Sequence, residues 1–324
     1  MTESESRPIT AIHDDCWFLT GPTASGKTRT ALLLAERIDA EIISLDSMAI
    51  YRGMNIGTAK PTLAERQRVK HHMIDILDPN ESFSVAEYLT RAHSIVEEIH
   101  QRGHRALFVG GTPMYLKVLL RGIFGGPEAD WEFRKQVEAQ VALHGKEAIH
   151  RQLAQVDPLS AHKFHPNDIR RVTRALEVYH LTGQPISHQQ QEFENQTSVN
   201  KQFVFQLCWP RETLHQRIEE RVTEMFAEGL VNEVQTLLES YNELGRTALQ
   251  AVGYREVVEH LQGGRNLEET MEQVIFHTRR FARRQETWFR GFPECKQVEM
   301  TDSKSPESIV DEVLVLADQQ TTST

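Results

Sequence analysis

The stretch GPTASGKT, residues 21–28, decides the fold of this chain. It follows the short apolar run at residues 16–19 and leads into residues 29–34, whose apolar positions have helical spacing. A strand, a glycine-rich turn and a helix start form the setting in which GxxxxGK[ST] cradles phosphates with backbone N–H groups. There Lys27 reaches a terminal phosphate oxygen and the Thr28 hydroxyl ligates Mg²⁺. The motif predicts a polyphosphate site, without saying whether the phosphate is transferred or discarded.

The first 125 residues alternate between strand-like and helix-like segments. The strand candidates are residues 16–20, 41–45, 72–77 and 105–109, and an amphipathic helix beginning near Val85 ends at Gly103. Strands separated by helices predict right-handed βαβ units and a mostly parallel sheet. Asp46 and Gly110-Gly111-Thr112 each follow one of these strands. We therefore expect them beside the phosphate loop, at the carboxyl edge of the sheet where such folds bind ligands.

The pattern changes after residue 125. The following segment is polar and helical in pattern, whereas residues 202–209 predict another buried strand. A helical segment inserted between two strands of one sheet is the preferred interpretation. The predicted fold class is α/β, a P-loop NTPase-like parallel sheet flanked by helices, formed by residues 1–125 and 200–324. Residues 126–199 are predicted to form an inserted all-helical domain that binds RNA.

Composition narrows the class of protein. No stretch approaches eighteen consecutive apolar residues, which argues against a membrane span. The acidic, polar N-terminus lacks the features of a signal peptide, so a cytoplasmic location is expected. The formal net charge of −10 excludes a protein coated in positive charge, but a local basic stripe can still bind RNA.

Asp46 opens the segment DSMAIYRGMNIGTAKP, residues 46–61. A carboxylate that leaves a buried strand beside a phosphate site can act as a general base or as an outer ligand of a metal ion. Alternatively, the side chain caps the helix that follows. Both interpretations stay open at this point.

A basic stripe lies near the C-terminus. On a helix at ~100° per residue, residues 271–290 place five arginines within one arc of ~140°. These are Arg279, Arg280, Arg283, Arg284 and Arg290. The opposite, apolar side consists of Met271, Val274, Phe281, Ala282, Trp288 and Phe289. A merely solvated face would mix acidic with basic side chains, and only Glu272 falls within the arc. The stripe therefore favours binding to RNA phosphates.

Seven segments, taken in order, resemble the tRNA dimethylallyltransferase family, also called tRNA isopentenyltransferases or IPP transferases, of the bacterial type. They are GPTASGKT, DSMAIYRGMNIGTAKP, HHMIDILDP (71–79), GGTPMYLKVLLRG (110–122), NDIRRVTRALEV (167–178), QAVGYREV (250–257) and ARRQETWFR (282–290). The resemblance implies transfer of a dimethylallyl group from dimethylallyl diphosphate to N6 of the adenosine 3′-adjacent to the anticodon. The implied acceptors are tRNAs that read codons starting with U, and diphosphate is released. The resemblance also implies Mg²⁺ as cofactor, the anticodon stem-loop as partner and a monomeric enzyme.

The same resemblance implies roles for individual residues. The catalytic residues would be Asp46, which takes the proton from the adenine amine, Thr112, which holds the base, and Arg221, which contacts the leaving diphosphate. The donor diphosphate would be bound by Gly21, Pro22, Thr23, Ala24, Ser25, Gly26, Lys27 and Thr28. The tRNA would be bound by Asp46, Ser47, Met48, Ala49, Thr112, Arg134, Arg170, Arg171, Val172, Thr173, Arg174, Gln250, Gly253, Arg279, Arg280, Arg283, Arg284, Gln285, Thr287, Trp288 and Arg290. Ala49 stands where the family often has glutamine, which puts one adenine contact in doubt.

Three other functions compete. A small-molecule P-loop kinase would use Lys27 and Mg²⁺ on ATP, but nothing in such a kinase explains the arginine stripe. A prenyltransferase acting on free adenine nucleotides would not need that stripe either. A non-catalytic RNA-binding module would not need an intact Lys27, Thr28 and Asp46.

Overall fold

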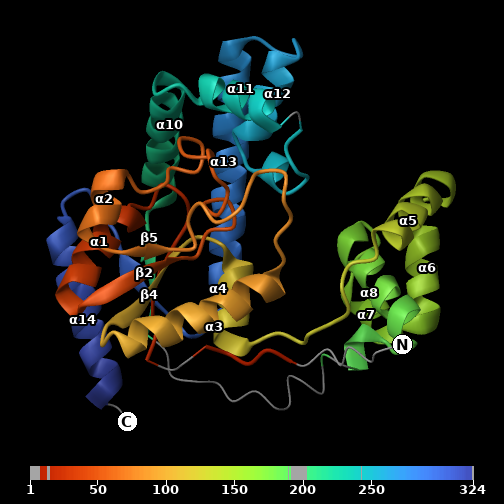
Figure 1. The fold of residues 1–324 in the computed structure, drawn as a ribbon, viewed down its shortest axis with the longest axis horizontal. Coiled ribbons are helices and arrows are strands. Elements are labelled where there is room, and N and C mark those ends of the chain that lie inside the picture. The colour runs from red at the N-terminus through yellow and green to blue at the C-terminus, as the bar shows by residue number, and fades with distance from the viewer. Residues whose placement is uncertain (1–7, 13–14, 189, 191–202, 242, 323–324) are drawn as a thin grey trace. The chain divides into compact units, whose positions relative to one another are not determined.

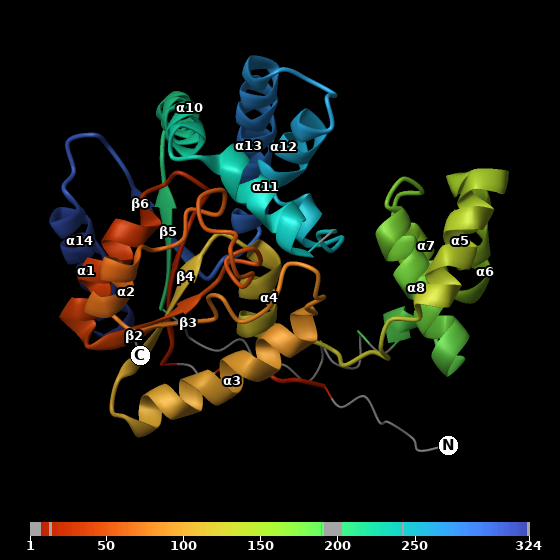
Figure 2. The ribbon, with the colours of Figure 1, turned by 45° about the horizontal axis from the view of Figure 1, so that its top comes forward.

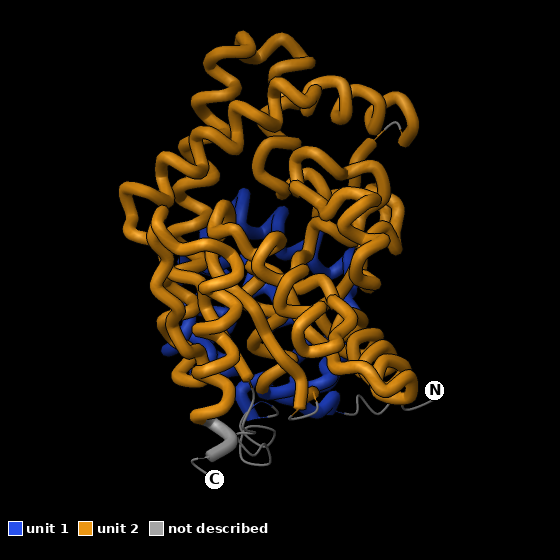
Figure 3. Tube along the Cα trace, turned by 90° about the vertical axis from the view of Figure 1, so that its left-hand side faces the viewer, with its two compact units in different colours: residues 1–11, 121–199 blue, residues 12–120, 200–324 orange. Residues whose placement is uncertain are grey.

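The computed structural model describes residues 8–12, 15–188, 190, 203–241 and 243–322 (Figure 1). The chain divides into two compact units, one of residues 1–11 with 121–199 and one of residues 12–120 with 200–324 (Figure 3). We call them the helical unit and the core unit. This division places the first eleven residues with the helical unit, whereas the predicted boundary left them in the core. The reason is a pairing of Ile9 with Ile123 in an isolated antiparallel bridge.

The core unit contains a six-stranded sheet in the order β3-β2-β4-β1-β5-β6, and every neighbouring pair is parallel (Figure 2). The strands are β1 Trp17–Thr20, β2 Ala40–Ser44, β3 His71–His72, β4 Arg105–Gly110, β5 Phe203–Cys208 and β6 Cys295–Glu299. The predicted parallel α/β fold is therefore confirmed. Because β4 lies between β2 and β1, the loops that follow these three strands meet at one edge.

Two strands differ from expectation. The predicted strand at residues 72–77 is wrong beyond His72, because Met73 and Asp75 have φ angles of 60° and 55°. This left-handed conformation cannot continue an extended strand. The edge strand β6 was not predicted, since Val298 is its one fully buried residue and its sequence has no apolar run.

Nine α-helices of the core unit are described, together with a short 3₁₀ turn at Ala248–Gln250. They are α1 Lys27–Ile38, α2 Leu63–Arg68, α3 Val85–Gln101, α4 Pro113–Arg121, α10 Arg211–Ala227, α11 Leu230–Tyr241, α12 Tyr254–Leu261, α13 Leu267–Phe289 and α14 Pro306–Thr322. Helix α4 ends at the boundary between the two units. None of the described helices is long and apolar enough to cross a bilayer.

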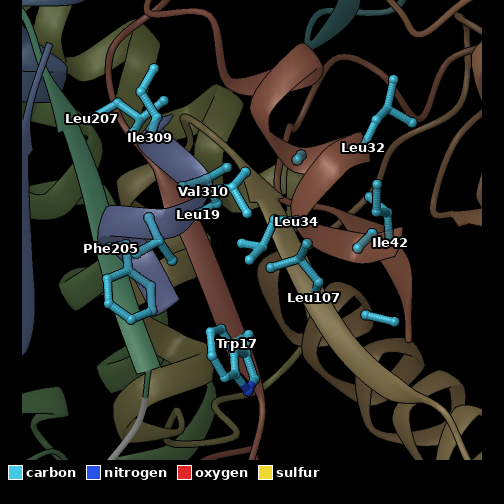
Figure 4. Packing of buried hydrophobic residues seen from close by; sticks show 14 of the residues in the cluster. Trp17, Leu19, Leu32, Leu34, Ile42, Leu107, Phe205, Leu207, Ile309 and Val310 are labelled. Carbon is cyan, nitrogen blue, oxygen red and sulfur yellow. The ribbon is translucent and has the colours of Figure 1, made fainter. Parts of the chain in front are cut away.

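The main apolar core lies where α1 and α14 cover one face of the sheet (Figure 4). Leu34 of α1 and Val310 of α14 are at most 1% exposed and pack with Leu19 of β1 and Leu107 of β4. Burying each such side chain stabilises the fold by about 1.5–3 kcal/mol. The amphipathic helix predicted from Val85 onward is confirmed as α3.

The helical unit contains α5 Trp131–His144, α6 Lys146–Val156, α7 Pro158–Lys163 and α8 Ile169–Thr182. It has an apolar core of its own, in which Ile149, Leu153 and Val172 are fully buried. The helical character predicted for this segment is confirmed as far as α8. The end of the predicted inserted domain, residues 191–199, lies outside the described residues.

Candidate active site

The loops after β1, β2 and β4 are joined at the carboxyl edge of the sheet. The Leu45 N–H donates to the Val109 carbonyl at 2.7 Å, and the Thr112 N–H donates to the Leu45 carbonyl at 3.1 Å. The Thr20 hydroxyl donates to the Gly110 carbonyl at 2.9 Å. A Cβ on Gly110 would lie 2.2 Å from the Leu45 carbonyl oxygen, so only glycine permits this approach. The sheet therefore brings together the three strand ends that the sequence singled out.

A cavity of about 580 Å³ opens at this edge. That volume lies within the range of pockets that bind small molecules. The sequence-predicted residues that line it are Thr23, Ala24, Ser25, Gly26, Lys27, Thr28, Asp46, Ser47, Met48, Ala49, Thr112, Arg221, Gln250, Gly253, Arg284 and Gln285. All three candidate catalytic residues thus share one cavity with most of the phosphate loop.

Lys27 holds the phosphate loop in its curved shape from inside. Its Nζ donates to the carbonyls of Gly21 at 2.9 Å and Pro22 at 2.6 Å. Gly26, at φ 86°, ends the loop at the first turn of α1. Gly21 and Pro22 form the loop but do not line the cavity, and what they contribute to it is the position of the Lys27 amine, through their carbonyls.

Three side chains from distant parts of the chain hold the same loop from outside. The indole Nε1 of Trp209 donates to the Ser25 carbonyl at 3.0 Å, and Nε of Arg217 donates to the Ala24 carbonyl at 2.9 Å. The Thr23 N–H donates to the Gln285 side chain at 2.9 Å. Sequence analysis missed Trp209 and Arg217, because no spacing rule links them to a loop almost 200 positions away.

The cavity wall carries more positive than negative charge. Burial, together with the Arg221 guanidinium, lowers the pKa of Lys27 to about 7, while Asp46 opposes the shift. Burial also lowers the pKa of Arg221, again against the effect of Asp46. The charged forms of Lys27 and Arg221 are thus disfavoured in the cavity, although one carboxylate stands near both. A bound anion would stabilise both positive charges.

Asp46 uses one carboxylate oxygen for structure. Its Oδ1 accepts a hydrogen bond from the Met48 N–H at 2.8 Å. The predicted helix cap is wrong, because residues 47–50 form a bend and a turn and the next helix begins only at Leu63, so this bond holds a turn instead. No described residue donates a hydrogen bond to Oδ2. The adjacent Ser47 N–H donates to the Thr112 hydroxyl at 3.1 Å, which connects this segment to the loop after β4. The turn hydrogen bond and proton acceptance are compatible, since each can use a different oxygen.

Glu233 on α11 fixes the backbone of three residues in the loop that follows β2. Its carboxylate accepts hydrogen bonds from the N–H groups of Asn55, Ile56 and Gly57, at distances between 2.8 and 3.3 Å. Gly57 lines the cavity. Sequence analysis did not identify Glu233, whose carboxylate acts at a distance of more than 170 positions along the chain.

The arginines predicted to bind tRNA in the helical unit serve mainly the structure of that unit. Glu177 is fully buried and accepts from Arg134 at 2.7 Å and from Arg174 at 2.5 Å. Burial disfavours the ionised form, but the two arginines outweigh it and hold the pKa of Glu177 below its ordinary value. Arg171 pairs with Asp168 at 2.9 Å, whereas Arg170 is exposed without such a partner among the described residues.

Val172 and Thr173 were also expected to bind tRNA. The expectation for the Val172 side chain is corrected, because that side chain is fully buried in the core of the helical unit. Thr173 is half-buried. The resemblance transferred a whole segment, and it could not tell which face of α8 turns inward.

On α13, Arg280, Arg283, Arg284 and Arg290 are exposed, as the predicted stripe requires. Arg279 is instead half-buried and pairs with Glu219 of α10 at 2.7 Å. The apolar side is only partly as predicted. Val274, Ala282 and Phe289 are buried, but Phe281 and Trp288 are 36% and 40% exposed. Phe281 lines the cavity, where an aromatic ring can stack on a base.

Two further residues predicted to bind tRNA lie on α13. Gln285 is only 4% exposed, and both ends of its amide are bonded to cavity loops. Gln285 nevertheless lines the cavity, so its role in binding tRNA stays a prediction. Thr287 is exposed but donates its hydroxyl hydrogen to the Arg283 carbonyl within the helix.

Comparison with known proteins identifies the family of this chain. Residues 49–292 match the family model described as IPP transferase. The tRNA dimethylallyltransferase of Rhodopirellula baltica is 50% identical over 98% of this chain and 99% of its own length. The crystal structure of a tRNA isopentenylpyrophosphate transferase from Bacillus halodurans is similar with a TM-score of 0.71, at 38% identity, over 96% of this chain and 98% of that one.

A second solved structure has the same fold. It is a eukaryotic dimethylallyltransferase acting on tRNA, with a TM-score of 0.76 and 28% identity, over 96% of this chain and 80% of that one. The family model, the near-full-length identity and the shared fold agree with one another. This chain belongs to the IPP transferase family.

Proposed function

We propose that this chain transfers a dimethylallyl group from dimethylallyl diphosphate to N6 of the adenosine next to the anticodon of tRNA. One observation carries the proposal. A single cavity combines an anion cradle, made by the phosphate loop with Lys27 and Arg221, with the Oδ2 atom of Asp46, to which none of the described residues donates a hydrogen bond. Because every one of these residues comes from one chain, a monomer suffices for the reaction.

The reaction needs both the anion cradle and the Asp46 carboxylate. Attack of the N6 amine on the allylic carbon breaks the bond to the diphosphate oxygen and builds negative charge on the leaving group. Lys27, Arg221 and the loop N–H groups stabilise that charge. Asp46 accepts the proton that the amine loses, through Oδ2. Thr112, held by the Ser47 N–H, orients the adenine.

The residues present suit Mg²⁺. The hydroxyl of Thr28 and the carboxylate of Asp46 line the same cavity, and oxygen donors are the ligands that Mg²⁺ prefers. We propose that Thr28 ligates the ion at the first turn of α1. When bound, Mg²⁺ would neutralise charge on the diphosphate.

The acceptor reaches the cavity from the side of α13. The target adenosine has to leave the stacked anticodon loop, which costs a few kcal/mol. The exposed arginines of α13 supply phosphate contacts beside the cavity, and Arg284 belongs to both surfaces. These contacts favour a tRNA acceptor over a free nucleotide.

To test the proposal, the protein is incubated with labelled dimethylallyl diphosphate, Mg²⁺ and unmodified tRNA, without ATP. We expect label on tRNA, and none on a control tRNA with guanosine at the target position. Labelling of free adenosine monophosphate in preference to tRNA would favour the nucleotide prenyltransferase. ATP turnover on a small acceptor, with no labelled tRNA, would favour the kinase and refute the proposal.

A further inference from the structure

Gln285 projects from α13 into the wall of the cavity. Its Oε1 accepts from the Thr23 N–H at 2.9 Å, and its Nε2 donates to the Gly111 carbonyl at 2.6 Å. Because a peptide N–H only donates and a carbonyl only accepts, these partners determine the orientation of the amide. The two partners belong to different loops, one after β1 and one after β4. A single buried side chain therefore joins the two loops.

Gly111 leaves the space that this side chain occupies. A Cβ at position 111 would lie 2.5 Å from Nε2 of Gln285 and 3.0 Å from the Gly21 carbonyl oxygen. No positive φ requires glycine there, unlike at Gly26. The second glycine of the GGT motif is thus explained by the close approach of Gln285 rather than by backbone conformation.

Both loops that Gln285 contacts carry residues of the proposed reaction. Thr23 lies in the phosphate loop, four residues before Lys27. On the other side, Thr112 follows Gly111 directly and bonds to the Ser47 N–H next to Asp46. Trp209 and Arg217 also hold the phosphate loop, but neither bonds to the loop after β4. The Thr20 hydroxyl joins the ends of the two strands, whereas Gln285 reaches the loops beyond them from a separate helix.

We propose that Gln285 is a positioning residue that sets the separation between the donor diphosphate and the acceptor adenine. The assignment of these ligands to the two loops rests on the proposed function. Displacement of a reacting group by ~1 Å can lower a rate by ~100-fold. The side chain therefore acts on the chemical step, through the distance between Thr23 and Gly111, rather than on the docking of tRNA.

Two substitutions separate the two hydrogen bonds. Gln285→Glu keeps an acceptor for the Thr23 N–H but places a carboxylate oxygen against the Gly111 carbonyl. Gln285→Leu removes both bonds while filling a similar volume. For both variants we expect single-turnover rates at saturating substrates to fall about 10- to 100-fold, with tRNA affinity unchanged. Glu286→Gln, one position along the helix, is the matched control and should keep the wild-type rate.

A double-mutant cycle tests the link to Gly111. Gly111→Ala should lower the rate strongly in the wild-type protein, because the new Cβ displaces the Gln285 amide. In a Gln285→Ala background only the closer contact is relieved and the 3.0 Å approach to the Gly21 carbonyl oxygen remains, so the same substitution should cost much less but not nothing. Strong coupling between the two sites would support the proposal. Equal effects of Gly111→Ala in both backgrounds would overturn it.

Binding of inorganic diphosphate keeps this test independent of the overall reaction. Gln285→Leu loosens the phosphate loop at Thr23, and we expect its affinity for diphosphate with Mg²⁺ to fall several-fold. If wild-type protein binds diphosphate but never labels tRNA, the proposed function fails while the role of Gln285 in the loop is still measured. If both Gln285 variants fold, as judged by thermal unfolding, and keep wild-type rates and diphosphate affinity, the positioning role is refuted.

Discussion

Strand β2 has a carboxylate near each end, and the two ends differ in how their charges are balanced. At the amino end Glu41 is 7% exposed and accepts from Arg102 Nε at 2.8 Å and from His72 Nε2 at 2.6 Å. Burial opposes its ionisation, but these partners outweigh it and lower the pKa of Glu41 to about 2. Beyond the carboxyl end, Asp46 stands near Lys27 and Arg221, two cations whose pKa values are both lowered.

The difference separates stability from function. At Glu41 each charge has a hydrogen-bonded partner, so the cluster stabilises the folded chain. Around Asp46 the cations keep part of their charge unbalanced, which costs stability but prepares the cavity for an anionic ligand. Sites of this kind are expected to carry strained electrostatics that the rest of the fold compensates. Replacing the same type of residue at each end should therefore have different consequences.

The largest expected effect is that of Asp46→Asn. The amide keeps an oxygen for the Met48 N–H but no longer accepts a proton, so we expect the turnover number to fall by about 10³-fold. The measurement is single-turnover transfer with saturating tRNA and donor, together with the tRNA dissociation constant, which should stay close to wild type. Glu41→Gln, at the other end of the strand, is the control and should retain activity at 25 °C. Normal turnover of Asp46→Asn would leave Asp46 only the structural role of holding the turn at Met48.

The next effect is the loss of stability in Glu41→Gln. The folded pKa of about 2 lies below the ordinary 4.5, so the stabilisation is complete above pH 4.5 and disappears as the pH falls toward 2. The shift corresponds to about 3 kcal/mol of unfolding free energy at pH 7. Urea unfolding at pH 7 and pH 3 measures it. Glu98→Gln, whose carboxylate is exposed and 3.9 Å from Arg102, should change stability by less than about 1 kcal/mol.

The sequence alone was sufficient to predict those parts of the site that follow from a local motif and from the topology of the sheet. GPTASGKT indicates a strand-turn-helix by itself, and parallel strands necessarily bring Asp46 and Thr112 to the edge where that turn lies. Partners that are distant in sequence could not be found in this way. The pairing of Glu177 with Arg134 and the hold of Trp209 on Ser25 depend on tertiary packing, and no periodicity reports such contacts.

Helix α13 shows a second limit of prediction from sequence. A helical projection assumes one buried and one solvated face. Helix α13 instead packs on both α10 and α12 and also borders the cavity, where Phe281 is exposed although it projects with the apolar residues. The same packing gives Arg279 an acidic partner that the projection could not anticipate.

The contrast between balanced and unbalanced charges also applies to this helix. The triple variant Arg280→Gln, Arg283→Gln, Arg290→Gln removes exposed cations that do not line the cavity. We expect it to weaken binding of an anticodon stem-loop by about tenfold or more, and to flatten the salt dependence by roughly 0.7–0.9 per lost phosphate contact. Fluorescence anisotropy at several salt concentrations measures both. Arg279→Gln, whose charge Glu219 already balances, should have a smaller effect, and equal effects would remove the distinction.

The smallest effect is a proton taken up when the anion binds. With a pKa of about 7, Lys27 is mostly neutral at pH 8, and a nearby diphosphate raises that pKa because it stabilises the charged amine. Calorimetry of diphosphate binding in two buffers with different ionisation enthalpies should therefore show greater proton uptake at pH 8 than at pH 6. Lys27→Arg stays charged at both pH values, so the difference between the two proteins isolates Lys27 from the titration of the ligand. If wild type and Lys27→Arg take up the same number of protons, the pKa of Lys27 is not lowered in the folded protein, and the contrast drawn with the cluster around Glu41 fails at this residue.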